Sequence, residues 1–141
     1  MGLVDRAKNI CLTPKTEWPV IAGETATTGG LMSGYVAPLA ASPPVAGLSG
    51  SLIFEPIRVG SISAAIIGVF VTWVVTIALV FLIGVLINTL ADQFDADRND
   101  IGAQKVAAYS ITPALLSGLF SLWPPLWWVS LIALAAMVYV M

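Results

Sequence analysis

Long apolar runs separated by short polar gaps dominate this chain. The longest run, residues 59–91, contains no charged residue. A helix of about 20 apolar residues spans a bilayer, so this run is long enough. With about 1.5 Å of rise per residue it would reach about 50 Å, against a hydrocarbon core of about 30 Å. We therefore expect the run to tilt, to extend past the membrane, or to bend at a glycine such as Gly68 or Gly84.

Three further apolar segments accompany this run. The first is long enough to span but carries Pro38, Pro43 and Pro44. Proline removes a backbone donor, so this segment is predicted to be kinked or split, with protein or water meeting the freed carbonyls. The pattern predicts an all-α fold, a polytopic transmembrane helix bundle with about four membrane segments, at residues 29–54, 60–91, 105–122 and 126–141. Because the last segment ends without a polar flank, the sequence suggests a truncated product or fragment, with a re-entrant end as the alternative.

Residues 1–28 have a different pattern and are expected to form an N-terminal segment separate from the bundle of residues 29–141. Apolar residues recur there at helical spacing: Leu3, Val4, Ala7, Ile10 and Cys11. Polar residues fall on the opposite face: Asp5, Arg6, Lys8 and Asn9. The amphipathic helix is predicted to end at Thr13, because the following proline disfavours helical geometry there. Its apolar face could lie in the membrane interface or pack on the protein's own helices.

The next segment contains Lys15, Glu17 and Trp18. Trp18 has an apolar ring and one N–H donor, which suits the boundary between water and lipid. We interpret it as an interface anchor, with a partner-binding motif as the alternative. Aromatic residues gather again around the start of the last apolar segment, where Trp123, Trp127 and Trp128 are predicted to form an aromatic belt.

Composition supports a membrane protein and excludes several classes. Apolar residues make up 58% of the chain and charged residues 10%, whereas a soluble domain carries roughly 25% charged residues. The charges lie in the gaps between apolar runs, as membrane insertion requires. The net charge of −2 and the lack of a basic patch indicate no nucleic-acid partner. A single cysteine, Cys11, excludes an internal disulfide and a cysteine metal cluster.

The polar loop after the longest run resembles the start of a calcium-binding loop at residues 95–100. The resemblance then fails, because Asp100 stands where the loop needs glycine and Val106 where it needs a bidentate glutamate. We therefore predict a solvated acidic loop and no bound metal.

Basic residues predict the orientation in the membrane. Most of them precede the first segment or lie between the second and third segments: Arg6, Lys8, Lys15, Arg98 and Lys105. One basic residue, Arg58, lies between the first and second segments. The positive-inside rule then places the N-terminus, the acidic loop and Met141 on the cytoplasmic side.

Catalysis is the least supported function. The chain has no histidine, which removes the commonest general base, and Cys11 has no histidine to activate it. Asp95 and Asp97 lie in the solvated loop rather than in a dry pocket. A pair of Lys105 and Ser110 is conceivable, but a lysine at a membrane boundary is explained by snorkelling. We predict a protein that is no enzyme and needs no cofactor.

Two motifs resemble the Yip family, named for proteins that interact with Ypt/Rab GTPases. Residues 3–10 (LVDRAKNI) with 14–21 (PKTEWPVI) resemble the start of its bacterial members, and residues 104–114 (QKVAAYSITPA) resemble its stretch after the second-to-third span loop. The resemblance implies a bundle of about five helices in the bacterial inner membrane. From the residues of these two motifs we take six candidate interaction residues: Lys15, Glu17, Trp18, Lys105, Tyr109 and Pro113. For Tyr109 and Pro113 the alternative is helix packing and a kink. The acidic loop and the missing last part of the bundle depart from the family pattern.

A membrane scaffold or interaction protein is the function that this sequence favours. Its partners would be the lipid bilayer and either another protein or a second copy of the chain. The alternative is a small transporter or channel subunit, which the absence of charge within the apolar runs disfavours. Transport would be favoured if Thr72, Thr76, Asn88 and the carbonyls around the prolines converged on a wet cavity.

Overall fold

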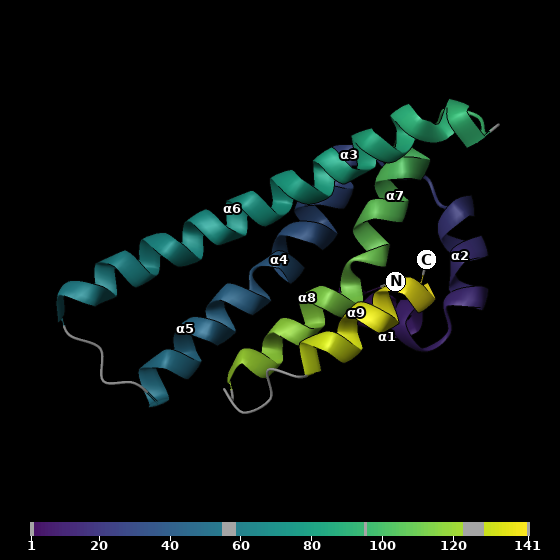
Figure 1. Cartoon of the computed structure of the whole chain (residues 1–141). Coiled ribbons are helices and arrows are strands. Elements are labelled where there is room, and N and C mark those ends of the chain that lie inside the picture. The colour runs from purple at the N-terminus through teal and green to yellow at the C-terminus, as the bar shows by residue number, and fades with distance from the viewer. Residues whose placement is uncertain (1, 55–58, 95, 123–128, 141) are drawn as a thin grey trace.

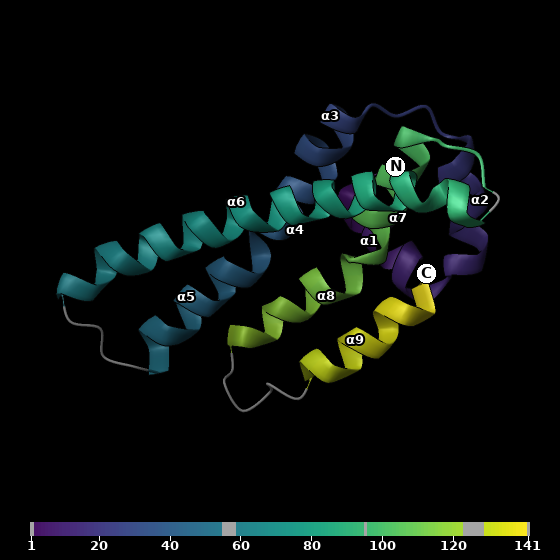
Figure 2. The same ribbon diagram turned by 45° about the horizontal axis from the view of Figure 1, so that its top comes forward.

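The computed structural model describes residues 2–54, 59–94, 96–122 and 129–140. Within these ranges every regular element is a helix, which confirms the all-α prediction. The chain begins with α1 (Leu3–Leu12) and α2 (Pro14–Gly23), which meet at Thr13 as the proline predicted. In Figures 1 and 2 these two helices lie at one end of the molecule, next to α7 and the C-terminal helix α9.

The first long apolar segment is helical but interrupted. It consists of α3 (Thr28–Leu31), a π-helical turn η1 (Met32–Val36), α4 (Ala37–Ala40) and α5 (Ser42–Phe54). Together they form a 27-residue segment, Thr28–Phe54, that is long and apolar enough to cross a membrane. The predicted kink is confirmed.

The partners of the freed carbonyls in this segment are protein groups. Pro43 has no N–H to donate to the Leu39 carbonyl, and the Ser42 hydroxyl donates to that oxygen at 2.7 Å. The indole N–H of Trp73, on the neighbouring helix, donates to the Ala37 carbonyl at 2.7 Å. The interruption is therefore held by hydrogen bonds within the chain.

The longest run forms α6 (Val59–Leu90), followed by the short 3₁₀ helix η2 (Ala91–Phe94). Figure 1 shows α6 as one continuous helix without a sharp bend, so tilting or extension past the membrane remains expected. The segment Ile62–Phe94 is the second one long and apolar enough to cross a membrane, and only 6% of its most apolar window is buried. Apolar side chains project on most sides of α6, as in a helix surrounded by lipid.

The third predicted span differs from its prediction. Helix α7 (Asp100–Ser110) starts five residues earlier, and α8 (Thr112–Ser117) and the 3₁₀ helix η3 (Gly118–Leu122) continue it in separate pieces. Pro113 lies in the first turn of α8, where its missing N–H is tolerated. Helix α9 (Val129–Val140) ends the described chain. Two candidate spans are found in the described residues, so the count of four is not confirmed.

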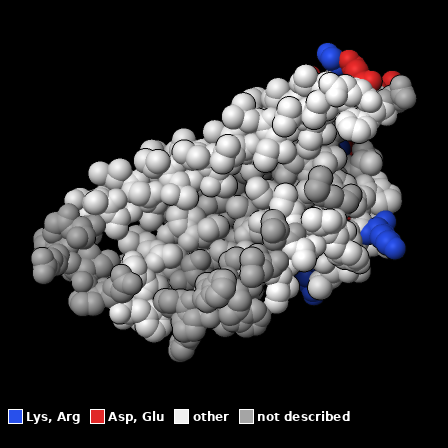
Figure 3. All heavy atoms as spheres, in the orientation of Figure 1, with Lys and Arg blue, Asp and Glu red and all other residues white. Residues whose placement is uncertain are grey.

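Charge is distributed unevenly over this fold. On the face shown in Figure 3, the coloured Lys, Arg, Asp and Glu atoms gather toward the end that holds α2 and η2, and the opposite half carries none among the residues that are described.

The predicted aromatic belt (Trp123, Trp127, Trp128), Arg58, Asp95 and Met141 lie outside the described residues. The expected boundary at residue 28 stays a prediction.

Side chains from eight of the described helices and from the π turn form the core. The largest fully buried ones are Ile10, Ile21, Val36, Val80, Thr112 and Val140. Helix α1 therefore packs on the protein's own helices. Its division into faces differs from the prediction, because Arg6 is 6% exposed and Val4 is 75% exposed. Ala7 and Ile10 are buried, as the helical spacing of apolar residues predicted. Arg6 is buried as well, because it forms an ion pair with Glu17 inside the protein.

Candidate functional site: a buried ion-pair cluster

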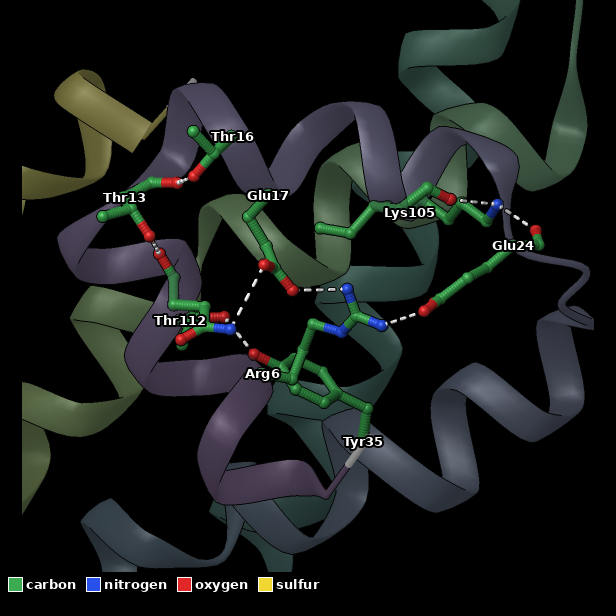
Figure 4. Close-up of polar contacts among 10 residues, drawn as sticks. Arg6, Thr13, Thr16, Glu17, Glu24, Tyr35, Lys105 and Thr112 are labelled. Carbon is green, nitrogen blue, oxygen red and sulfur yellow. Dashed lines mark hydrogen bonds and ion pairs between the residues drawn. The ribbon is translucent and has the colours of Figure 1, made fainter.

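The polar end of the molecule, which we define as α1, α2 and α7, is built around Arg6. The Nη1 atom of Arg6 lies 2.5 Å from Oε1 of Glu17, and its Nη2 atom donates to Oε1 of Glu24. The other Glu17 oxygen accepts from the Asn9 amide at 3.3 Å. Figure 4 shows the two carboxylates reaching the guanidinium from α2 and from the residue that follows it. One arginine thus joins α1 to both ends of α2.

Burial makes these contacts important for stability. The side chains of Arg6 and Glu17 are 7% and 6% exposed, whereas that of Glu24 is 43% exposed. Removing one member of a buried pair leaves its partner's charge uncompensated and costs about 3–5 kcal/mol. Burial lowers the pKa of Arg6, but the hydrogen bond and charge of Glu24, helped by Tyr109 and Glu17, outweigh it and raise the pKa above its ordinary value. The guanidinium therefore stays charged.

Lys105 on α7 adds a second buried cation, and its position corrects the sequence-based interpretation. We expected it to snorkel at a membrane boundary, but it is 8% exposed. Its Nζ atom donates to the carbonyls of Ile21 and Glu24, both at 2.7 Å. These carbonyls belong to the C-terminal end of α2, where a cation also meets the negative end of the helix dipole. Lys105 thereby fastens α2 to α7.

An aromatic group lies beside the charges. The Tyr109 ring lies 4.7 Å from that of Tyr35 and 6.3 Å from that of Trp18, centroid to centroid, and the Arg6 Cζ atom is 5.8 Å from its centroid. The Tyr35 hydroxyl is 2.9 Å from Oγ1 of Thr112. Such edge and cation contacts each add about 0.5–1.5 kcal/mol.

Trp18 also differs from its expected role as an interface anchor. Its indole N–H donates to the Val140 carbonyl of α9 at 2.7 Å, and the side chain is half-buried. The indole donor, which an interface anchor would offer to water or a lipid headgroup, is used inside the protein. Its use as a partner-binding residue is untested.

Four of the six candidate interaction residues come together here: Glu17, Trp18, Lys105 and Tyr109. Lys15 is exposed on the outer face of α2, and Pro113 is buried beside Cys11 at the start of α8. The sequence-based set omitted Arg6, Glu24 and Tyr35. The sequence contained one indication of this cluster. Glu17 and Glu24 lie about two helical turns apart, so a helix places both carboxylates on one side. Two carboxylates on one side favour a cation between them.

An open cavity of about 930 Å³ adjoins the cluster. Arg6, Glu24, Tyr35 and Tyr109 line it, together with several glycines that have no side chain to fill it. Both charged groups in this lining are already paired with each other. Within the described residues, no three histidine, cysteine or acidic side chains gather where they could hold a metal ion.

The polar groups of α6, which would mark a transport path if they converged, have separate partners. Thr76 donates to the Thr72 carbonyl of its own helix at 2.8 Å, and Asn88 donates to Asp100 on α7. The Ala37 carbonyl is bonded to Trp73. These groups therefore do not meet around one cavity.

Comparisons with known proteins give one match. A family model described as the Yip1 domain matches residues 8–141. The matched range begins within α1 and includes the cluster residues on α2 and α7 as well as the apolar helices. No curated protein and no solved structure matches the chain.

Proposed function

Because the chain belongs to the Yip1 domain family, which is a family of membrane proteins, we propose that it is a non-enzymatic scaffold in the bacterial inner membrane. In this proposal the apolar helices α5 and α6 lie in the lipid. The polar end lies at the cytoplasmic surface, where it offers a fixed surface to another protein.

The observation that supports this proposal is the closed set of contacts in the ion-pair cluster. Arg6 and Lys105 balance Glu17 and Glu24 in charge, and each of the four has a partner within the chain. A reactive site needs a group that is free to act on a substrate, whereas a closed network only fixes geometry. Its consequence is that α1 and α2 are held in place on α7.

The surfaces left for recognition are the outer face of α2, with Lys15, and the acidic loop, with Asp97. Both residues are exposed. Trp18 and Tyr109 would support these surfaces from beneath rather than contact the partner. The alternative of a transporter is less favoured, because the polar groups of α6 have separate partners.

Site-specific photo-crosslinking in native membranes tests the proposal. A photoreactive amino acid replaces Lys15 in one variant and Asp97 in another, and adducts are identified by mass spectrometry. The matched control replaces Phe70 on α6, which is 60% exposed and apolar. We expect one reproducible protein adduct at Lys15 or Asp97, and lipid adducts at Phe70.

Two outcomes would contradict a scaffold. If all three positions form adducts with lipid, no protein partner binds at Lys15 or Asp97. If the protein adducts contain only a second copy of this chain, the protein forms a homo-oligomer and does not act as an adaptor for another protein. Solute flux through vesicles containing the purified protein would instead support the transporter alternative.

A further inference from the structure

The outer face of α1 is unusual for a helix at the polar end. Val4 and Leu12 are 75% and 66% exposed, and the exposed Lys8 lies between them at steps of four residues. Residues four apart share one helix face, so a single lysine is flanked by two apolar side chains. No ion pair to Lys8 is formed within the described residues, although Asp5 is one turn away.

An apolar groove of about 310 Å³ runs beside this face. Helix α1 lines one wall with Val4, Ala7 and Lys8, and the other walls include Pro38, Leu39 and Leu116. The Ser42 hydroxyl in the lining is bonded to the Leu39 carbonyl. The ammonium group of Lys8 therefore supplies the charge of this groove.

A second apolar groove, of about 220 Å³, also has Leu116 in its lining. Its lining includes Cys11 from α1, Phe120 from η3 and Ile132 from α9, and no charged residue. Helix α1 contacts both α8 and α9, and Figure 2 shows it beside them. The two grooves therefore adjoin at Leu116, and we call this residue their shared ridge.

We propose that this face binds one anionic phospholipid, with its phosphate at Lys8 and one acyl chain in each groove. Opposite charge favours an anionic headgroup, because Glu17 and Glu24 already pair with Arg6 and do not neutralise Lys8. The apolar lining favours hydrocarbon, and the lysine stem can lie along it while its ammonium group reaches the headgroup. Two grooves that share a ridge match the two chains of a single lipid.

Native mass spectrometry of the purified full-length chain tests this site. Phosphatidylglycerol is added to detergent micelles in one series and phosphatidylcholine in another. We expect one retained phosphatidylglycerol per chain and weaker retention of phosphatidylcholine. Lys8→Gln should weaken the anionic lipid about fivefold, the factor expected for one lysine near an anionic lipid surface.

Two variants provide controls. Lys8→Arg should retain the lipid because it keeps the charge, and Lys15→Gln should retain it because Lys15 lines neither groove. Both lysines are exposed, so the substitutions leave the core intact. A phosphatidylglycerol with a photoreactive group at its chain end should crosslink to the segments around Pro38 or Leu116.

Several outcomes would overturn the proposal. Equal retention of the two lipids, or equal loss in Lys15→Gln and Lys8→Gln, would mean that no site at Lys8 selects the headgroup. Displacement by glycerol phosphate alone would indicate a site for a free phosphate compound. Crosslinks confined to α6 would show that lipid contacts the chain elsewhere.

Discussion

The polar end and the apolar arm, which we define as α5, α6 and η3, are held by different interactions. At the polar end, charged side chains pair in the interior and a lysine caps a helix across a separation of 84 residues. In the arm, helices approach closely at glycines. A Cβ atom at Gly84 would overlap the Gln104 amide of α7, and one at Gly118 would overlap Pro43 of α5.

The difference follows from the surroundings of each region. Between helices in lipid there is no hydrophobic driving force, so small residues and interhelical hydrogen bonds hold them together. The Gln104 amide of α7 donates to the Phe81 carbonyl of α6 at 3.1 Å, so an interhelical hydrogen bond joins the arm to the polar end. Where water is near, ion pairs can form before they are buried. The same chain therefore uses charge at one end and close backbone approach in the arm.

The largest expected effect is at Arg6. Arg6→Met should lower the free energy of unfolding by about 3–5 kcal/mol, because Glu17 then stays buried without its cation. The control Arg98→Met breaks the pair with Asp92, in which both side chains are 58% exposed, and should cost less than about 1 kcal/mol. Denaturant unfolding in one detergent measures both.

The stabilisation that the Arg6 charge provides depends on pH in a defined direction. Since the pKa of Arg6 is raised on folding, its stabilising charge is fully present below the ordinary value and is lost only as pH rises through the raised one. The difference between wild type and Arg6→Met should therefore be constant between about pH 7 and pH 9. Equal losses in Arg6→Met and Arg98→Met would contradict the contrast between buried and exposed pairs.

A smaller loss is expected at Lys105. Lys105→Met removes two hydrogen bonds from the end of α2 and should cost about 2 kcal/mol. Hydrogen exchange should accelerate in the last turn of α2 while α6 is unchanged. The control is Lys15→Met on the exposed face of α2, which should change neither measurement. Unchanged exchange in Lys105→Met would show that the lysine does not fasten α2.

The smallest effect is expected in the arm. Gly118→Ala should destabilise by about 1 kcal/mol or more, because its Cβ would meet Pro43, including the backbone of that residue. Gly68→Ala is the matched control, since nothing lies within 4 Å of a Cβ there. It should change stability by no more than about 0.5 kcal/mol. Thermal unfolding of the two variants in one detergent separates them, and equal stabilities would refute close packing at Gly118.

The arm was more predictable from sequence than the polar end. A charge-free run defines α6, and Pro43 forces the interruption before α5, because each feature acts on its own segment. Arg6 and Lys105 were misjudged for the opposite reason. Helical period assigns a charged residue to the polar face by default, and it carries no information on partners far along the chain. The hydrogen bond of Trp18 could not be predicted for the same reason, since its acceptor is 122 residues away.

That long separation also bears on how the molecule is made. Helices α1 and α2 leave the ribosome before α7 and α9, and Arg6 can meet Glu17 within that short stretch. Lys105, Tyr109 and the Val140 carbonyl are synthesised later, so the end of α2 has no partner for its carbonyls until they appear. Closing such distant contacts is slow compared with local helix formation. Helices α1 and α2 are thus translated well before the partners that fix them in place on α7 and α9.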